Sequence, residues 1–497
     1  MITTPTHLPG KPFTRRRCLQ QGLLSLGGLA LRGAQAAPAR PNILFIAVDD
    51  LRPELGCYGR NYIKSPNIDR IARQGMTFNR AYCQQAVCSP SRSSLLTGAR
   101  PDSTKVWDLV THFRDAMPNV VTLPQHFKQN GYFVQGMGKI FHPGYDDPRS
   151  WSTPWQTPNP PAYAQVKTSP VADDDKPRKN GKRGKSGPPF ESADVPDNTF
   201  KDGMVAEWAV GTLRALAGKP APFFLAVGFA KPHLPFVSPK KYWDLYDPAR
   251  IKLAPNPFHP RDAPEYALTN SGELRNYQGM PADGPIPDDL ARRLKHGYYA
   301  AISYTDAQIG KVLDELDRLD LRKNTIIVLW GDHGWKLGEH GEWAKHSNVE
   351  NDANAPLLLS VPGMKNAGKS SEALVEFVDI YPTLSELAGM PLPGHLEGSS
   401  MKPLLDNPAL RWKPAAFSQY PRGRGLMGYS MRTDRYRFTV WVGRGDHSKV
   451  DAIELYDHQA DPQENTNIAK APANAELVHR LMEQWRRGWR AAKPDAR

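Results

Sequence analysis

The apolar run at residues 42–48, Asn-Ile-Leu-Phe-Ile-Ala-Val, constrains the fold more than any other stretch of the chain. It is short, continuous and rich in β-branched residues, which is typical of a strand buried on both faces of a parallel sheet. A second run of this kind spans residues 324–330. The two runs predict neighbouring strands inside an α/β sheet.

Helical and strand-like segments alternate along most of the chain, which predicts an α/β fold with a large mixed or parallel sheet sandwiched by helices. The expected helices are 68–75, 122–130, 205–217, 294–319 (as one helix or two) and 380–389, and the further strands are 133–137, 222–229 and 355–361.

Polar residues follow both apolar runs directly: Asp49 and Asp50 after the first, Asp332 and His333 after the second. The carboxyl ends of parallel strands meet at one edge of a sheet, where α/β proteins build their ligand sites. Two strand ends rich in oxygen ligands suggest one divalent cation between them. The alternative for the aspartate pair is a helix N-cap beside a solvated loop charge.

Residues 86–98, Ala-Val-Cys-Ser-Pro-Ser-Arg-Ser-Ser-Leu-Leu-Thr-Gly, combine a thiol, a proline and an arginine before a short apolar run. Pro90 biases the residue before it away from the α region, so we expect Cys88 in a sharp loop and a helix that begins near Ser91. Arg92 would then lie in the first helical turn, where anions are held. The alternative is a small buried cysteine and a surface arginine.

Three further loops carry cationic side chains. Lys139 and His142 lie three residues apart after the strand at 133–137, His233 follows the strand at 222–229, and Lys345 comes shortly after the second carboxylate pair. Hydrolysis of an anionic ester needs a nucleophile, positive groups around the anionic oxygens and an acid for the leaving alcohol. The chain offers a candidate for each requirement.

The segment 86–98 resembles the modification signature of the type I, formylglycine-dependent sulfatases. The stretch Asp332–Lys345, with the loops 138–144 and 231–236, is most similar to the iduronate-2-sulfatase branch of that family. The resemblance covers nearly the whole chain after the leader and is weakest in 157–192 and in the C-terminal region. It implies an alkaline-phosphatase-like sulfatase fold.

The resemblance also implies roles for individual residues. Cys88 would be oxidised by a formylglycine-generating enzyme, and the hydrated aldehyde would attack the sulfur of a sulfate ester. Arg92 and Lys139 would polarise the formylglycine and the sulfate, and His142 would assist collapse of the sulfated intermediate. His233 and Lys345 would bind the sulfate or protonate the leaving oxygen. One calcium ion would be bound by Asp49, Asp50, Asp332, His333 and the modified Cys88.

His333 departs from the broad sulfatase pattern, in which many members have asparagine at this position. Imidazole matches a hard, oxygen-seeking cation poorly, so His333 either binds the ion or lies beside it. The iduronate-2-sulfatase branch shares the histidine, and we therefore retain it among the ligands.

The sequence thus predicts an enzyme, a sulfuric ester hydrolase that removes sulfate from a carbohydrate, with glycosaminoglycan fragments or other sulfated polysaccharides as substrates. A phosphodiester or phosphonate hydrolase of the same superfamily is an alternative, because a metal-held nucleophile in a cationic pocket also suits phosphoryl transfer. A further alternative is an inactive protein that binds sulfated glycans with Cys88 still a thiol.

Four side chains in the segment that follows the second strand are candidates for lining the mouth of the substrate pocket. Trp335, Lys336, His340 and Trp343 would present aromatic faces and cationic tips suited to a pyranose and its acidic groups. The alternative is that both tryptophans pack beneath the loop.

The first 36 residues predict an export signal. Residues 14–19 are Thr-Arg-Arg-Arg-Cys-Leu, an apolar stretch follows to Leu31, and Ala34-Gln-Ala36 offers a small-residue cleavage site. This is a twin-arginine-like signal, and its apolar run is too short and glycine-rich for a stable membrane span. We expect an exported protein in the periplasm or outside the cell, with no membrane span after cleavage.

Three cysteines remain after the leader, and the sequence leaves open whether Cys57 and Cys83 form a disulfide. The net charge of +13 favours polyanionic partners. Sulfated glycans and nucleic acid fit the charge equally well, but no basic stripe with interleaved aromatic residues or nucleic-acid module is recognisable, so we expect no nucleic-acid partner.

Three segments of the remaining chain differ from the alternating α/β pattern. Residues 157–192 are rich in Pro, Gly, Lys and Asp, which predicts a mobile basic insertion in a catalytic domain spanning 37–410. Residues 255–287 are spaced by prolines and predict an ordered loop near the rim of the site. Short alternating strands and a final helix at 474–491 predict a smaller α+β subdomain at 411–497.

Overall fold

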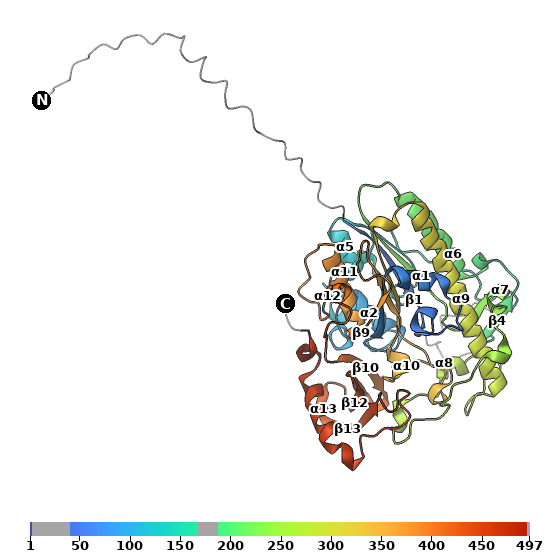
Figure 1. The fold of residues 1–497 in the computed structure, drawn as a ribbon, viewed down its shortest axis with the longest axis vertical. Helices are drawn as coiled ribbons and strands as arrows, with labels where there is room; N and C mark the ends of the chain where they lie inside the picture. The colour runs from blue at the N-terminus through green and yellow to red at the C-terminus, as the bar shows by residue number, and fades with distance from the viewer. Residues whose placement is uncertain (2–39, 167–186, 495–497) are drawn as a thin grey trace, which may run out of the picture. The chain divides into compact units, whose positions relative to one another are not determined.

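A seven-stranded sheet forms the centre of the computed structural model, which describes residue 1, residues 40–166 and residues 187–494 (Figure 1). Its strand order is β3-β5-β1-β7-β8-β2-β9. All neighbouring strands are parallel except β8, which is antiparallel to both β7 and β2. The predicted mixed sheet is confirmed. The strands are β1 (Asn42–Val48), β2 (Met76–Tyr82), β3 (Phe133–Gly138), β5 (Phe223–Phe229), β7 (Thr325–Gly331), β8 (Leu357–Ser360) and β9 (Lys369–Glu376).

Strand β1 supplies side chains to both faces of the sheet. Leu44 and Ile46 belong to one hydrophobic core, and Ile43 and Phe45 belong to the other. Successive side chains of a strand point to opposite faces, so an uninterrupted apolar run requires cover on both sides. The whole strand is buried.

Two sets of helices provide that cover (Figure 1). Helices α1 (Pro66–Gln74), α6 (Lys201–Leu216) and α9 (Asp288–Arg318) pack on one face. Helices α2 (Cys88–Thr97), α5 (Leu123–Gln129), α11 (Ile380–Leu387) and α12 (Lys402–Asp406) pack on the other. The short helices are α3 (Pro101–Thr104), α4 (Phe113–Ala116), α7 (Lys240–Trp243), α8 (Gly272–Arg275) and α10 (Glu350–Ala353).

The predicted elements lie close to the observed ones, and the differences include the following. Helix α9 is one continuous helix and begins at Asp288, six residues before the predicted start. Strands β2 and β9 were not predicted, because their sequences mix polar and apolar residues. Helix α2 begins at Cys88 and not near Ser91.

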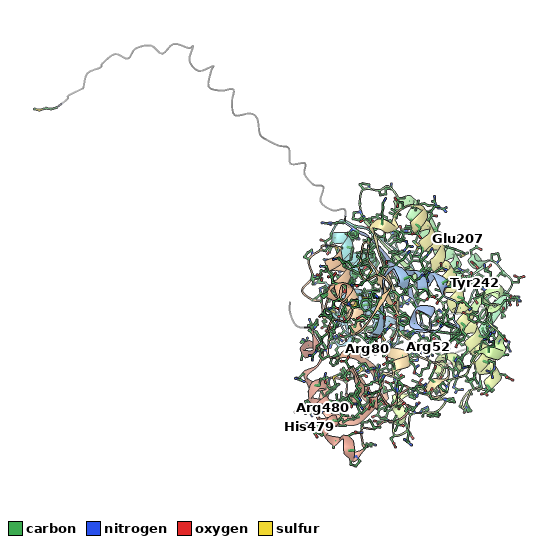
Figure 2. All side chains as sticks on the ribbon, in the orientation of Figure 1. Arg52, Arg80, Glu207, Tyr242, His479 and Arg480 are labelled. Carbon is green, nitrogen blue, oxygen red and sulfur yellow. The ribbon has the colours of Figure 1, made fainter. Side chains whose placement is uncertain are left out.

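The C-terminal region forms a four-stranded antiparallel sheet backed by a helix, as predicted. The strands β10 (Ala416–Arg422), β11 (Leu426–Arg432), β12 (Tyr436–Gly443) and β13 (Asp446–Asp457) follow one another in order, and α13 (Ala475–Arg487) covers them. Arg80 of β2, labelled in Figure 2, donates from Nη2 to Asp434 Oδ1 at 3.0 Å and so ties this sheet to the large one. The chain from Arg40 onward forms one compact unit, and the boundary at 410/411 stays a prediction.

The predicted insertion at 157–192 is partly built into the fold. Residues 190–192 belong to strand β4 (Phe190–Ala193), which pairs in parallel with β6 (Phe236–Pro239), and Tyr163 is buried. The mobile-insertion prediction is therefore wrong for these ends, which pack through aromatic residues. Its centre, 167–186, and the export signal lie outside the described residues. Within the described ranges, no helix combines the length and apolarity needed to cross a bilayer.

Candidate active site

The ends of β1 and β7 bring four predicted residues together. The two strands pair in parallel, with Val48 opposite Gly331, so Asp49, Asp50, Asp332 and His333 emerge side by side. All four are buried. Asp50 N donates to Asp332 Oδ1 at 3.0 Å, which joins the two strand ends directly.

Asp50 adopts a left-handed backbone conformation, with φ of +57°. Aspartate tolerates this region better than most residues, yet it is uncommon outside glycine. Tyr298 on α9 stabilises it, because its hydroxyl donates to the carbonyl oxygen of Asp50 at 2.7 Å. The turn directs the carboxylates of Asp49 and Asp50 toward different cations, as described below.

Cys88 is the first residue of α2, so the predicted loop placement is wrong. The first hydrogen bond of the helix runs from Ser91 N to Val87 O at 3.1 Å. Pro90 lies within the first turn, where its missing N–H costs no hydrogen bond. Cys88 Sγ lies 3.5 Å from Asp49 Oδ1 and 3.4 Å from His333 Nε2. The thiol thus faces both strand ends.

Arg92 lies in the second turn of α2, not the first, and its side chain is fully buried. Its Nε donates to Asp332 Oδ2 at 2.8 Å, and its Nη2 donates to Asp49 Oδ1 at 3.1 Å. Its Nη1 donates to the carbonyl oxygens of Lys139 and Ile140. One guanidinium therefore connects β1, β7 and the loop after β3.

The loop after β3 supplies Lys139 and His142. Lys139 Nζ donates to Asp49 Oδ2 at 2.5 Å and lies 3.7 Å from Cys88 Sγ. His142 is buried, and its ring stacks on Tyr145 with 6.1 Å between centroids. Gly138 has a φ of +69°, and a Cβ there would lie 2.0 Å from Gly228 O, so only glycine permits this close turn.

His233 and Lys345 meet at a carboxylate that sequence reasoning missed. His233 Nε2 lies 3.1 Å from Glu273 Oε1, and Lys345 Nζ donates to the same oxygen at 3.1 Å. Lys345 Nζ also donates to both oxygens of Asp50 at 3.0 Å. Its ammonium lies 5.0 Å from the centroid of the Trp335 ring.

The charges in the cluster shift the pKa values of its members. Burial by itself would raise the pKa of Asp49, but Lys139, His233 and Arg92 outweigh it and hold the pKa well below its usual range. Burial raises the pKa of the Cys88 thiol well above its usual value, and the Asp49 carboxylate adds to this rise. As an unmodified residue, Cys88 is a protonated thiol at neutral pH and a poor nucleophile.

The donor set fits a divalent cation. Ligand atoms of Asp49, Asp50, Cys88 and His333 all lie within 4.8 Å of one another. His333 Nδ1 lies 3.0 Å from the carbonyl oxygen of Gly334, which can only accept, so Nδ1 carries a hydrogen. Nε2 is the ring nitrogen that faces the cluster, 3.4 Å from Asp50 Oδ1, so it is the atom of His333 that would bind a metal ion. The carboxylate oxygens are the ligands that calcium prefers.

A cavity of about 290 Å³ opens onto Cys88. Residues of the predicted rim loop, 255–287, form one wall, which confirms the placement of that loop. The lining residues are Val87, Cys88, Leu109, Thr269, Asn270, Gly272, Glu273, Asn276, Lys345 and His346. A larger cavity of about 420 Å³ lies on the C-terminal sheet around Arg432 and Arg435, away from the nucleophile candidate.

The predicted aromatic rim is wrong. Trp335 and Trp343 belong to the hydrophobic core, where Trp335 packs edge-on against Phe236. Lys336 is fully buried and pairs with Asp352 and Glu342. His340 is also buried. The two tryptophans support the loop from beneath, because their aromatic surface gains more from core burial than from exposure at the cavity mouth.

Cys57, Cys83 and Cys88 are free thiols, and they are all the cysteines in the part of the chain that the structure describes. The disulfide that the sequence left open between Cys57 and Cys83 is therefore not formed. Burial raises the pKa of Cys83 well above its usual value, so this thiol is unreactive.

The fold and this cluster define an alkaline-phosphatase-like hydrolase with a cysteine beside the carboxylate-rich strand ends of its sheet. Comparison with family models identifies the class: the sulfatase model matches residues 41–390. The model for the C-terminal region of N-sulphoglucosamine sulphohydrolase matches residues 338–489. The chain belongs to the sulfatase family and is a sulfuric ester hydrolase.

Individual relatives agree with this assignment. Iduronate 2-sulfatase of Mus musculus is 38% identical, and the match covers 91% of this chain and 95% of that protein. A solved protein in complex with its substrate D-glucosamine-2-N,6-O-disulfate has a TM-score of 0.72 at 23% identity, covering 92% of this chain and all of the other. The phosphonate monoester hydrolase of Agrobacterium radiobacter has a TM-score of 0.72 at 22% identity, covering 91% and 96%. These two structures show the fold alone.

Proposed function

We propose that the protein removes sulfate from a carbohydrate by means of a formylglycine formed from Cys88 and one calcium ion. The observation that carries this proposal is the position of Cys88: it lies in the wall of the cavity, 3.7 Å or less from Asp49, His333 and Lys139. A side chain at this position can reach a sulfuryl group that enters the cavity. Cationic side chains lie close to the same position.

Calcium would be held by Asp49, Asp50, Asp332, His333 and the modified Cys88. When bound, the ion supplies positive charge next to the nucleophile and the sulfate, and the formylglycine supplies the nucleophile. Arg92 is fixed by two of these carboxylates, so it keeps the strand ends at a set separation. The existing pairs with Arg92, Lys139 and Lys345 limit the repulsion between the carboxylates.

The remaining cations serve the substrate. Lys139 extends toward Cys88 Sγ and would bind the sulfate together with Arg92. His233 contacts Glu273 and Lys345 contacts Asp50, and from these positions they would bind the sulfate or protonate the leaving oxygen. His142 follows Lys139 in the same loop and would assist release of the sulfate.

The substrate class rests on the relatives. The mouse protein that shares 38% of its residues with this chain is named iduronate 2-sulfatase. We therefore propose a 2-O-sulfated uronic acid within a glycosaminoglycan or another sulfated polysaccharide. We further propose that the protein matures with a formylglycine-generating enzyme and acts in the periplasm or outside the cell.

Three measurements test the proposal. Mass analysis of the peptide that contains Cys88 should give the formylglycine mass in native material, and an unmodified thiol would contradict the mechanism. Sulfate and phosphate esters of one alcohol should be compared, because faster phosphate cleavage would favour the alternative of a phosphodiester or phosphonate hydrolase. Binding of a sulfated glycan without turnover would favour an inactive binding protein.

The uronic acid is tested by chemistry on the substrate. Reduction of its carboxylate to an alcohol should lower kcat/KM by roughly one to two orders of magnitude, the scale of one charge-assisted hydrogen bond. A panel of defined sulfated monosaccharides and disaccharides completes the test. A preference for neutral sulfated hexoses would exclude a uronate-specific pocket and leave the sulfatase chemistry intact.

A further inference from the structure

We infer that Glu273 is a positioning residue that sets His233 and Lys345 against the departing sugar oxygen. The inference rests on the proposed function and adds a residue to it. Glu273 lies on α8, within the loop that forms the cavity wall, and its side chain is 16% exposed. A single oxygen of this carboxylate lies 3.1 Å from both His233 Nε2 and Lys345 Nζ.

The two nitrogens of His233 have different partners. Nδ1 lies 2.6 Å from the carbonyl oxygen of Leu234, which can only accept a hydrogen bond. Nδ1 therefore carries a hydrogen. Nε2 faces Glu273 Oε1, an ionised oxygen that also can only accept, so Nε2 carries a hydrogen as well. The geometry thus holds the ring with one N–H fixed to the backbone and the other at the cavity wall.

Lys345 is held in a similar way between two carboxylates. Its ammonium donates to Asp50 and to Glu273, and the Trp335 ring lies beneath it. His233 and Lys345 come from loops more than a hundred residues apart in the sequence, and Glu273 contacts both. Without its negative charge, two buried cations would face each other with less compensation, and their separation would increase.

Glu273 stays ionised in this setting. Burial by itself would raise its pKa, but the charges of Lys345 and His233 outweigh burial and lower the pKa well below the usual value. The carboxylate is therefore a permanent acceptor for both cations at neutral pH.

The chemistry assigns a role to this arrangement. As the nucleophile at position 88 forms its bond to sulfur, the S–O bond of the ester breaks. The electron pair of that bond moves to the sugar oxygen, which takes a proton from His233 Nε2 and leaves a neutral imidazole. An aliphatic alkoxide needs this proton far more than a phenolate does. A residue that orients the donor is therefore important for sugar esters and unimportant for activated aryl esters.

The test compares Glu273→Gln with the wild-type enzyme on two substrates, a 2-O-sulfated uronic acid disaccharide and 4-nitrophenyl sulfate. We expect kcat for the sugar ester to fall about 100-fold, with KM within about threefold, and kcat for the aryl ester to fall less than about threefold. Glu273→Asp should recover at least about tenfold for the sugar ester. Glu265→Gln, the same change at an exposed position of the same loop, should match the wild type.

A spectroscopic readout is independent of turnover. In protein labelled with ¹⁵N-histidine, the Nε2–H signal that disappears in His233→Gln should shift in Glu273→Gln and stay in place in Glu265→Gln. Equal losses for both esters, a change in KM alone, or an unmoved Nε2–H signal would each overturn the inference. If the wild-type enzyme cleaves phosphate esters and not sulfate esters, the proposed function fails. The role of Glu273 can then still be tested with the phosphate esters of the same sugar and of 4-nitrophenol.

Discussion

Arg92 Nε donates to Asp332 Oδ2 at 2.8 Å, and both side chains are fully buried. A buried ion pair adds little net stability, but loss of one partner leaves an uncompensated charge in the interior. Arg92→Met should therefore lower the free energy of unfolding by about 3–5 kcal/mol, as measured by urea denaturation. Arg70→Met, which removes a partly exposed pair with Asp314, should cost less than about 1 kcal/mol. Equal costs for the two variants would contradict the argument.

Cys88→Ala should abolish turnover and leave the fold intact. The side chain is small, so its loss alters packing little, but in the proposed mechanism it provides the whole covalent step. Cys88→Ser should also be strongly impaired, because a hydroxyl does not give the aldehyde hydrate without a serine-type modifying enzyme. Steady-state rates and thermal melting of each variant check the prediction. Cys57→Ala serves as the control and should retain activity; substantial activity in Cys88→Ala would remove this residue from the mechanism.

Asp49→Asn should lose bound calcium and turnover together, and Asp332→Asn should behave in the same way. Each change removes a negative charge from a buried site where carboxylate oxygens attract the ion. Elemental analysis of the purified protein gives the calcium content, and thermal melting with and without a chelator shows whether the ion still stabilises the fold. Asp314→Asn, at an exposed site, should keep its calcium. Unchanged calcium in Asp49→Asn would exclude this residue from the site.

Glu464 should contribute to acid stability, far from the catalytic cluster. It is buried and pairs with Arg437 at 2.6 Å and with His458 at 2.8 Å. Burial by itself would raise the pKa of Glu464, but Arg437 and His458 outweigh it and lower the pKa to about 2. The folded pKa lies below the unfolded value of 4.5, so this stabilisation is fully present above pH 4.5 and is lost as the pH falls through 2.

The size of this contribution is roughly 3 kcal/mol at neutral pH. Glu464→Gln should be less stable than the wild type by about that amount at pH 6, and the difference should shrink steadily between pH 4.5 and pH 2. Urea denaturation at several pH values measures it. Glu476→Gln, on exposed α13 surface, should follow the wild type throughout. A difference that does not change with pH would show that Glu464 acts through packing alone.

The strand ends were predictable from the sequence because their signal is local. The run at 42–48 requires a buried strand, and Asp49 follows it directly, so its place at the edge of the sheet needs no knowledge of the rest of the chain. Strand β2 was not predictable in this way, because Thr77, Asn79 and Arg80 interrupt its apolar pattern. The start of α2 was missed because a proline can lie within the first turn of a helix as well as before it.

Glu273 and Trp335 show where local patterns stop being informative. Glu273 lies in an irregular, proline-spaced loop, and its partners His233 and Lys345 become neighbours only when the sheet assembles. Trp335 closely follows the end of β7, but Phe236 provides a buried position for its ring. Whether an aromatic side chain lines a cavity or supports it from beneath depends on such partners, which are distant in the sequence.

Cys88 is 2% exposed in the folded chain, enclosed by two strand ends and by Lys139. An enzyme that oxidises this thiol needs access to it, and the packed α2 and strand ends leave almost none of the side chain accessible. During synthesis, β7 leaves the ribosome long after Cys88, so the sheet edge that encloses the thiol cannot yet exist. We therefore expect the proposed oxidation to precede folding, and a chain that folds first should keep its thiol.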